Sequence, residues 1–191
     1  MQQPLAWLHA PAGSGKTSLV TSYLDSCDKE AIWYQIAAGD FDPASFFYFL
    51  SLAAKKPLGR TKTDLPPFRP EYNNALSAYT RNFFRELYTR AKKGTLFVID
   101  NYQDCPVDSP LHDALAQAFE EIPDGINLLI ISRDEPPAPY ARLRASGKIF
   151  LFNPQELALT LDESDAVCRS KLSERKTDCV IDSDQLRVAH E

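Results

Sequence analysis

The segment that most constrains the fold of this chain is residues 10–17, Ala-Pro-Ala-Gly-Ser-Gly-Lys-Thr. It matches a glycine-rich phosphate-binding loop, with Ala10 at the position where the first glycine is more usual. Gly13 and Gly15 can adopt backbone conformations closed to other residues, so consecutive N–H groups can converge on an anion. An apolar run precedes the segment and a helical stretch follows it. This context favours a phosphate-binding loop over the alternative, a glycine-rich turn that binds nothing.

The side chains of this loop suit ATP and Mg²⁺. Lys16 can place a point charge on the β- and γ-phosphates, and the Thr17 hydroxyl can ligate the metal. The helix that starts here directs the positive end of its dipole at the same phosphates. The predicted nucleotide-binding residues are Gly13, Ser14, Gly15, Lys16, Thr17 and Ser18.

A second apolar run, residues 95–100, ends in an acid. A carboxylate at the tip of a buried strand beside a phosphate loop holds Mg²⁺, directly or through water. We therefore predict Thr17 and Asp100 as the metal ligands.

A third run, residues 127–132, is followed by Arg133. Ligands of open α/β sheets bind at the carboxyl ends of the strands, so Arg133 is expected beside the phosphates. The alternative is a surface arginine paired with Asp134 or Glu135. The predicted catalytic residues are Lys16, Asp100 and Arg133.

Short apolar runs alternate with helical stretches along the chain, which indicates an α/β fold with a mostly parallel sheet. Most of the runs lack polar alternation, as expected for strands buried on both faces. The predicted strands are Leu5–His9, Ala31–Ile36, Thr95–Asp100, Asn127–Ser132 and Lys148–Phe152. Helices are predicted from Pro43 to Ala54 after an Asp42 cap, from Asn74 to Ala91, and from Leu111 to Glu121 after Ser109-Pro110.

Two segments stand outside this alternation. Residues 57–70 contain four prolines and few apolar residues, and we expect an extended surface linker. After Phe152, a capping box at Thr160–Glu163 predicts a new helix, and Ser183 predicts another. We therefore divide the chain into a P-loop NTPase domain at residues 1–155 and the start of a truncated helical region at residues 156–191.

Composition narrows the class of protein without giving a function. The 191 residues carry a net charge of −5, which gives no sign of a surface for nucleic acid or for an acidic membrane. The four cysteines lack CxxC pairing and the three histidines lack a metal-ligand pattern, so we expect reduced thiols and no zinc site. The longest apolar run, Ser45–Ala54, is too short for a membrane span. A cytoplasmic domain without a membrane partner is predicted.

The phosphate loop and the two strand ends, with the residues between them, resemble the ATPase domain of the STAND class, the signal-transduction ATPases with numerous domains. The similarity is greatest to the maltose-activator-like regulators, many of which carry LuxR-type or bacterial transcriptional activator domains. It covers about residues 4–165, and a serine-arginine pair followed by two prolines is its most specific part. The segments that carry it are His9–Thr17, Trp33, Asp40–Pro43, Phe46, Asp100–Tyr102, Glu121–Pro123, Ser132–Pro137, Ala141–Arg144 and Leu159–Leu161.

The resemblance implies a three-layer P-loop NTPase fold of the additional-strand type, with a parallel five-stranded sheet in the order 5-1-4-3-2. It also implies that Arg133 senses the γ-phosphate. In such regulators a helical region closes over the nucleotide, a C-terminal sensor binds an inducer, and an effector domain binds DNA. For this chain, contact with DNA is therefore expected only through domains that it does not contain. Nucleotide-dependent self-association is a further expectation.

Two departures from the family pattern concern hydrolysis and the choice of base. Many P-loop ATPases have a second acid after the metal aspartate, whereas this chain has Asn101, which cannot act as a base. Asp104 is close enough in sequence to replace it. The adenine-binding segment usual before the first strand is missing, since only residues 1–4 precede it. Selectivity for ATP thus follows from the resemblance alone.

These observations predict an ATP- and Mg²⁺-binding switch domain of a signal-responsive, transcriptional regulator, with slow or conditional ATP hydrolysis. One alternative is a P-loop kinase, for which residues 57–70, with Arg60 and Arg69, are the candidate lid. The other is a non-hydrolysing nucleotide-binding interaction domain, which Asn101 favours.

Overall fold

The computed structural model describes residues 3–27, 31–37, 39–40, 42–59 and 65–152. Within these ranges one parallel sheet has the strand order β2-β3-β4-β1-β5. Counted from the other edge, this is the predicted order 5-1-4-3-2, and the prediction is confirmed. The strands are β1 (Leu5–His9), β2 (Ala31–Gln35), β3 (Leu96–Asp100), β4 (Asn127–Ser132) and β5 (Ile149–Phe152).

The strand boundaries agree with the sequence to within one residue. β1 and β4 match their predicted ranges, and the other three strands are one residue shorter. The difference at β5 has a clear cause, because the Lys148 N–H donates to the Leu143 carbonyl at 3.0 Å and so belongs to the turn before the strand. At β2 the ladder continues past the assigned end, since the Ile36 N–H donates to the Asp100 carbonyl at 2.9 Å.

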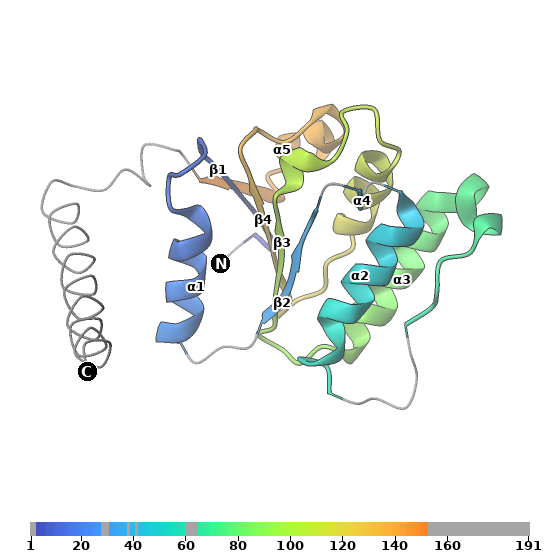
Figure 1. Ribbon diagram of the computed structural model, residues 1–191, viewed down its shortest axis with the longest axis horizontal. Helices are drawn as coiled ribbons and strands as arrows, with labels where there is room; N and C mark the ends of the chain where they lie inside the picture. Colours follow the sequence, from blue (N-terminus) through green and yellow to red (C-terminus); the bar gives the residue numbers. More distant parts are fainter. Residues whose placement is uncertain (1–2, 28–30, 38, 41, 60–64, 153–191) are drawn as a thin grey trace, which may run out of the picture. The chain divides into compact units, whose positions relative to one another are not determined.

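Helices cover both faces of the sheet, as Figure 1 shows. The helix α1 (Lys16–Ser26) lies on one face, and the helices α2 (Pro43–Lys55), α3 (Leu76–Arg90) and α4 (Leu111–Phe119) lie on the other. Alternate residues of each strand supply the two cores. In β1, for example, Leu5 and Trp7 join the core under α2, α3 and α4, whereas Ala6 and Leu8 join the core under α1.

The predicted starts of α2 and α4 are confirmed, whereas the start of α3 and the ends of all three helices differ by one or two residues. The Asp42 carboxylate accepts from the Ser45 N–H at 3.0 Å and caps α2. The Ser109 hydroxyl oxygen accepts from the Leu111 N–H at 3.3 Å at the start of α4, which ends two residues before the predicted Glu121. The helix α3 starts two residues later than predicted because Pro70–Ala75 forms a 3₁₀ turn, η1.

Besides η1, three further short elements were not predicted. They are the 3₁₀ turns η2 (Tyr102–Asp104) and η3 (Ala138–Tyr140), and the helix α5 (Ala141–Ala145). All three follow the carboxyl ends of strands β3 and β4, and each is too short to show a helical period in the sequence. They form the loops around the site described below.

The prediction of a surface linker for residues 57–70 needs correction in its described part. Leu65 is buried, and the Phe68 ring stacks on Phe47 with ring centroids 5.8 Å apart. The Tyr79 hydroxyl donates to the Pro66 carbonyl at 2.6 Å. The prolines keep this backbone extended, while the apolar side chains between them pack on α2 and α3.

The predicted boundary at residues 155/156 and the helices predicted after Thr160 and Ser183 lie outside the described residues. Among the described helices, none is both long and apolar enough to cross a membrane.

Candidate nucleotide-binding site

The predicted phosphate loop connects β1 to α1. Gly13 and Gly15 have φ angles of +78° and +79°, in the left-handed region that favours glycine. A Cβ atom added at either glycine would meet no atom within 4 Å, so the requirement for glycine is one of backbone conformation and not of space. The loop therefore has the backbone that its sequence predicts.

The amino terminus of α1 is suited to an anion. Its cap position is Gly15, which has no side chain to accept from the N–H groups of the first turn. The first turn also carries no acidic residue that would occupy the positive end of the helix dipole. The N–H groups of this turn are the donors that a phosphate group can use.

Lys16 lies over the loop. Its Nζ donates to the carbonyl oxygens of Ala10 at 2.5 Å and Pro11 at 2.9 Å, and to the Ser14 hydroxyl at 3.3 Å. Burial lowers the pKa of Lys16, and the nearby Arg133 charge lowers it further, while Asp100 acts in the opposite direction. Lys16 is thus close enough to Arg133 and Asp100 for their charges to affect its pKa.

Asp100 and Thr17 meet as the sequence predicts. The Thr17 hydroxyl donates to Asp100 Oδ2 at 3.2 Å, and the Asn101 N–H donates to Asp100 Oδ1 at 2.8 Å. Asp100 is buried, with 1% of its surface exposed, so these contacts are the ones that keep its carboxylate in place.

The pair of Thr17 and Asp100 fits Mg²⁺. Both side chains offer the hard oxygen atoms that this ion prefers, and Mg²⁺ typically takes its other ligands from phosphate groups and water. Among the described residues no group of three or more histidine, cysteine, aspartate or glutamate side chains could hold a metal ion on its own.

Arg133 lies at the carboxyl end of β4, next to the phosphate loop. Ser132 pairs in register with His9, and the Ala10 N–H donates to the Ser132 carbonyl at 3.4 Å. The Arg133 side chain is exposed. Within the described part of the chain no carboxylate forms an ion pair with it, and Glu135 instead pairs with Arg144 at 3.3 Å. The alternative of a surface ion pair with Asp134 or Glu135 therefore finds no support in these contacts.

Asn101 follows the metal acid in an unusual conformation. Its φ and ψ angles are 60° and 38°, and it is the only non-glycine with a positive φ among the described residues. Asparagine and aspartate tolerate this region better than most residues. Asp104, the candidate replacement for a second acid, lies at the other end of the same turn, where its N–H donates to the Asn101 carbonyl at 3.0 Å.

Two residues of this site carry no signature in the sequence. The Trp7 indole donates from Nε1 to the Asp134 carbonyl at 3.0 Å, and Gln103 Oε1 accepts from the Arg133 N–H at 3.0 Å. Each contact joins segments that are far apart in the sequence. The one available hint for Gln103 is its position in the loop directly after Asp100.

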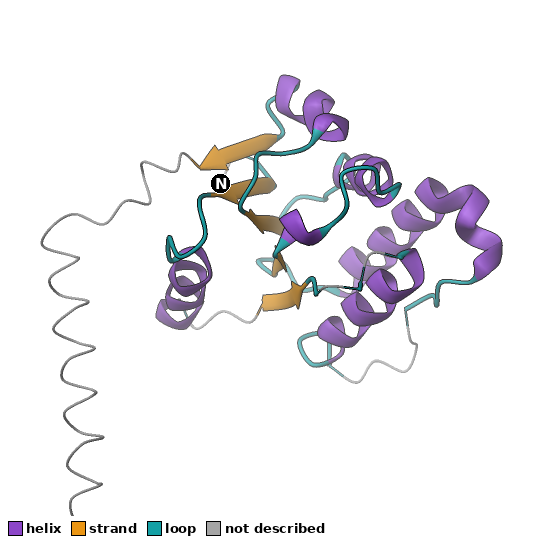
Figure 2. Ribbon diagram, turned by 45° about the horizontal axis from the view of Figure 1, so that its top comes forward, coloured by secondary structure: helices purple, strands orange, loops and turns teal. Residues whose placement is uncertain are grey.

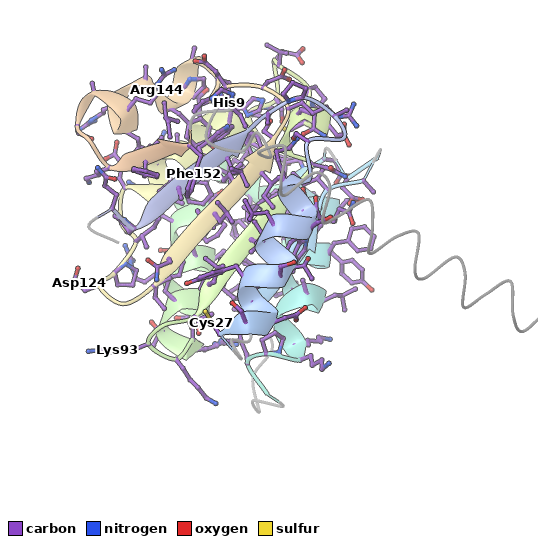
Figure 3. The ribbon with its side chains drawn as sticks, turned by 90° about the vertical axis from the view of Figure 1, so that its left-hand side faces the viewer. His9, Cys27, Lys93, Asp124, Arg144 and Phe152 are labelled. Carbon is purple, nitrogen blue, oxygen red and sulfur yellow. The ribbon has the colours of Figure 1, made fainter. Side chains whose placement is uncertain are left out.

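All these groups gather at one edge of the sheet, where the strands have their carboxyl ends. Figure 2 shows the loops that leave this edge between strands and helices. In Figure 3, His9 at the end of β1 lies with Arg144 at one end of the sheet, and Lys93 and Asp124 lie at the opposite end. The site therefore occupies the edge at which open α/β sheets bind ligands.

The sequence is similar to those of known transcriptional regulators. The chain is 28% identical over 173 residues to the HTH-type transcriptional regulator MalT of Cronobacter sakazakii, and 25% identical over 173 residues to MalT of Vibrio cholerae. The chain resembles MalT. Each alignment covers 89% of the chain and 19% of the regulator, so the chain spans about a fifth of these relatives. No family model matches the sequence.

A solved structure supports the fold. It is a signal-transduction ATPase with numerous domains and a tetratricopeptide repeat sensor, from Pyrococcus horikoshii, and it superposes with a TM-score of 0.55 at 19% identity. The match covers 88% of the chain and 23% of that protein. The P-loop NTPase fold and the predicted resemblance to STAND-type ATPase domains of MalT-like regulators are confirmed.

Proposed function

We propose that this chain is an ATP- and Mg²⁺-binding switch domain of a signal-responsive transcriptional regulator, with slow or conditional ATP hydrolysis. One observation carries the proposal: Lys16 and Thr17 begin α1 directly after the phosphate loop, and Asp100 and Arg133 lie beside that loop at the ends of the neighbouring strands β3 and β4. The resemblance to MalT supplies the regulatory context. DNA contact belongs in this proposal to other domains of a longer protein. The proposed location is the cytoplasm, and ATP is expected to promote self-association.

Each side chain has a distinct part in the proposed binding. The loop N–H groups and Lys16 hold the β- and γ-phosphates, and Thr17 with Asp100 holds the metal. Bound Mg²⁺ would neutralise phosphate charge. Arg133 contacts only the terminal phosphate, so it favours ATP over ADP. A switch requires such a difference in affinity between two ligand states.

Slow hydrolysis is part of the proposal because the usual second acid is absent. Asn101 supplies no base, and the Asp104 carboxylate accepts from Gln103 Nε2 at 3.3 Å. We expect turnover by the chain alone to stay below about 1 s⁻¹, the lower end of typical enzyme rates. Phosphate release measured under dilute conditions tests this, and a fast steady-state rate would favour a kinase or a self-sufficient ATPase.

The Lys16→Ala variant tests the binding site itself. Losing a charge-assisted phosphate contact should cost about 1.5–3 kcal/mol of ATP affinity. Calorimetry with ATP and Mg²⁺ measures this loss. The matched control is Lys93→Ala, which removes the same charge at the opposite end of the sheet (Figure 3) and should leave ATP affinity unchanged. Unchanged binding in Lys16→Ala would contradict the proposal.

The Asp100→Asn variant tests the metal. The carboxylate acts through Mg²⁺ and not on the nucleotide, so the variant should weaken binding with Mg²⁺ more than binding in EDTA. An equal loss in both conditions would point to damage to the fold, because Asp100 is buried.

The Arg133→Ala variant tests the switch. ATP affinity should fall by about 1.5–3 kcal/mol, while ADP affinity stays nearly the same. Arg133→Lys should restore only part of the loss, since a point charge replaces a planar group with several donors. A surface arginine would give almost no effect on either nucleotide.

A further inference from the structure

Gln103 connects the two strand ends that carry the metal acid and the predicted sensor. It lies in η2, which follows Asp100 at the end of β3. Its Oε1 accepts from the Arg133 N–H at 3.0 Å, just beyond the end of β4. Its Nε2 donates to Asn101 Oδ1 at 3.5 Å and to Asp104 Oδ1 at 3.3 Å. One amide therefore joins the loop after the metal acid to the backbone of the sensor arginine.

The orientation of this amide is fixed by its partners. The Arg133 N–H can only donate, so the atom facing it must be the amide oxygen. The amide nitrogen then faces the oxygen atoms of Asn101 and Asp104, both of which accept. The three contacts are mutually consistent.

The backbone that presents Gln103 is firmly anchored. The neighbouring Tyr102 is buried, and its hydroxyl contacts His112 Nδ1 at 2.8 Å and the Tyr140 hydroxyl at 2.7 Å. On the other side of Gln103, the Cys105 N–H donates to the Tyr102 carbonyl at 3.1 Å. A functional side chain is held most accurately when its own support is locked in this way.

The backbone of Asp134, next to Arg133, is held by two further hydrogen bonds. The Asp134 N–H donates to the Ser132 hydroxyl at 3.1 Å, and Trp7 donates to the Asp134 carbonyl. The Arg133 side chain is exposed and has no carboxylate partner among the described residues. The backbone therefore sets the direction in which the Arg133 side chain starts from β4, and Gln103 holds the N–H of that residue.

We infer that Gln103 is a positioning residue. It holds the backbone of Arg133 so that the side chain can reach the terminal phosphate, and it couples this position to the loop after Asp100. This inference rests on the proposed function, because it needs Arg133 to distinguish ATP from ADP. It goes beyond that function in naming the residue on which the distinction depends. Gln103 need not touch the nucleotide.

The test compares ATP and ADP affinities of Gln103→Met by calorimetry in Mg²⁺. Methionine keeps the length of the side chain and removes all three hydrogen bonds. We expect ATP affinity to fall about five- to tenfold, as for the loss of a hydrogen bond, and ADP affinity to change less than about twofold. Gln117→Met is the matched control, since Gln117 is an exposed glutamine of α4. Thermal unfolding of both variants shows whether they fold.

A double-variant cycle separates positioning from general damage. If Gln103 acts through Arg133, then Gln103→Met combined with Arg133→Ala should lose no more ATP affinity than Arg133→Ala alone. Additive losses, or an unchanged ATP-to-ADP affinity ratio in Gln103→Met, would overturn the inference and leave the sensor role of Arg133 intact. An unchanged ratio in Arg133→Ala would instead overturn the sensor role, and the inference with it.

Discussion

The two faces of the sheet are packed very differently. Under α2, α3 and α4 lies a broad core with many aromatic rings, including the fully buried Phe47, Phe83 and Phe84. Under α1 the described core is small, and Val20 is the buried residue that α1 contributes to it. Leu19 and Tyr23 of α1 are 52% and 49% exposed. Among the described residues, the larger core under α2, α3 and α4 makes the greater contribution to stability, and the core under α1, the helix that follows the phosphate loop, makes the smaller one.

This difference indicates that one face of the sheet contributes most of the folding stability, while the ligand site lies beside the other. Most of the free energy of folding comes from buried apolar surface, and that surface is concentrated away from the site. A helix with few buried contacts opens more readily. Contacts between a bound ligand and the first turn of α1 can therefore change the free energy of opening of this helix by a large fraction.

The largest effect is expected for Leu87→Ala on α3. Leu87 is fully buried in the aromatic-rich core. The substitution should lower the free energy of unfolding by about 2–5 kcal/mol, the range for a buried leucine replaced by alanine. Urea denaturation measures it. Leu19→Ala, an exposed leucine, is the control and should stay within about 0.5 kcal/mol of the parent chain.

The next effect concerns the ligand. ATP with Mg²⁺ at roughly a hundred times its Kd should raise the free energy of unfolding by about 2.7 kcal/mol. Without nucleotide, hydrogen exchange followed by mass spectrometry should show faster amide exchange in α1 than in α3. The difference between the two exchange rates should become smaller when nucleotide binds. Equal protection of α1 and α3 in the free chain would contradict the comparison of the two faces.

A matched leucine on α1 should give a smaller effect than Leu87. Leu24 is half-buried against the core under α1. Leu24→Ala should cost about 1 kcal/mol, since only part of its apolar surface is removed from water. The same urea experiment compares the two variants directly. A loss as large as that of Leu87→Ala would show that α1 is packed as tightly as α3.

The smallest effect is a pH dependence that arises on the densely packed face. Burial lowers the pKa of His112 below its ordinary value, although a hydrogen bond to the Pro106 carbonyl acts in the opposite direction. As pH falls below about 6.5, the unfolded chain binds the proton before the folded chain does. The free energy of unfolding should therefore decrease on acidification. Urea midpoints between about pH 7.5 and 5.5 should fall more steeply for the parent chain than for His112→Gln; parallel curves would count against this assignment.

The sequence predicted most of the frame that positions the site. The strands were identifiable because they are buried on both faces and so are almost wholly apolar. The place of Thr17 followed from the phosphate-loop pattern. The places of Asp100 and Arg133 followed from strand ends, since parallel strands bring their carboxyl ends to one edge. The order of the strands came from the family resemblance and not from periodicity, which contains no information on which strands are neighbours.

The remaining features depend on contacts between distant segments. The prolines around Leu65 and Phe68 suggested an exposed linker, because proline content says nothing about the side chains between the prolines. Gln103 is a polar residue in a polar loop, and its role exists only because β4 lies beside β3. The contact between Trp7 and Asp134 spans 127 positions of sequence and could not be read from either segment alone.

The positions of the two tryptophans allow two regions of this domain to be followed by fluorescence. The chain has two tryptophans, and the alternation along the strands puts Trp7 on the aromatic-rich face and Trp33 on the α1 face. Indole emission shifts with the polarity around the ring, so the dry Trp7 and the half-buried Trp33 should emit at different wavelengths. Trp7 also donates a hydrogen bond to the Asp134 carbonyl, next to Arg133, so its emission should report changes in that loop. The emission of Trp33 should report changes in α1, the helix that begins at the phosphate loop.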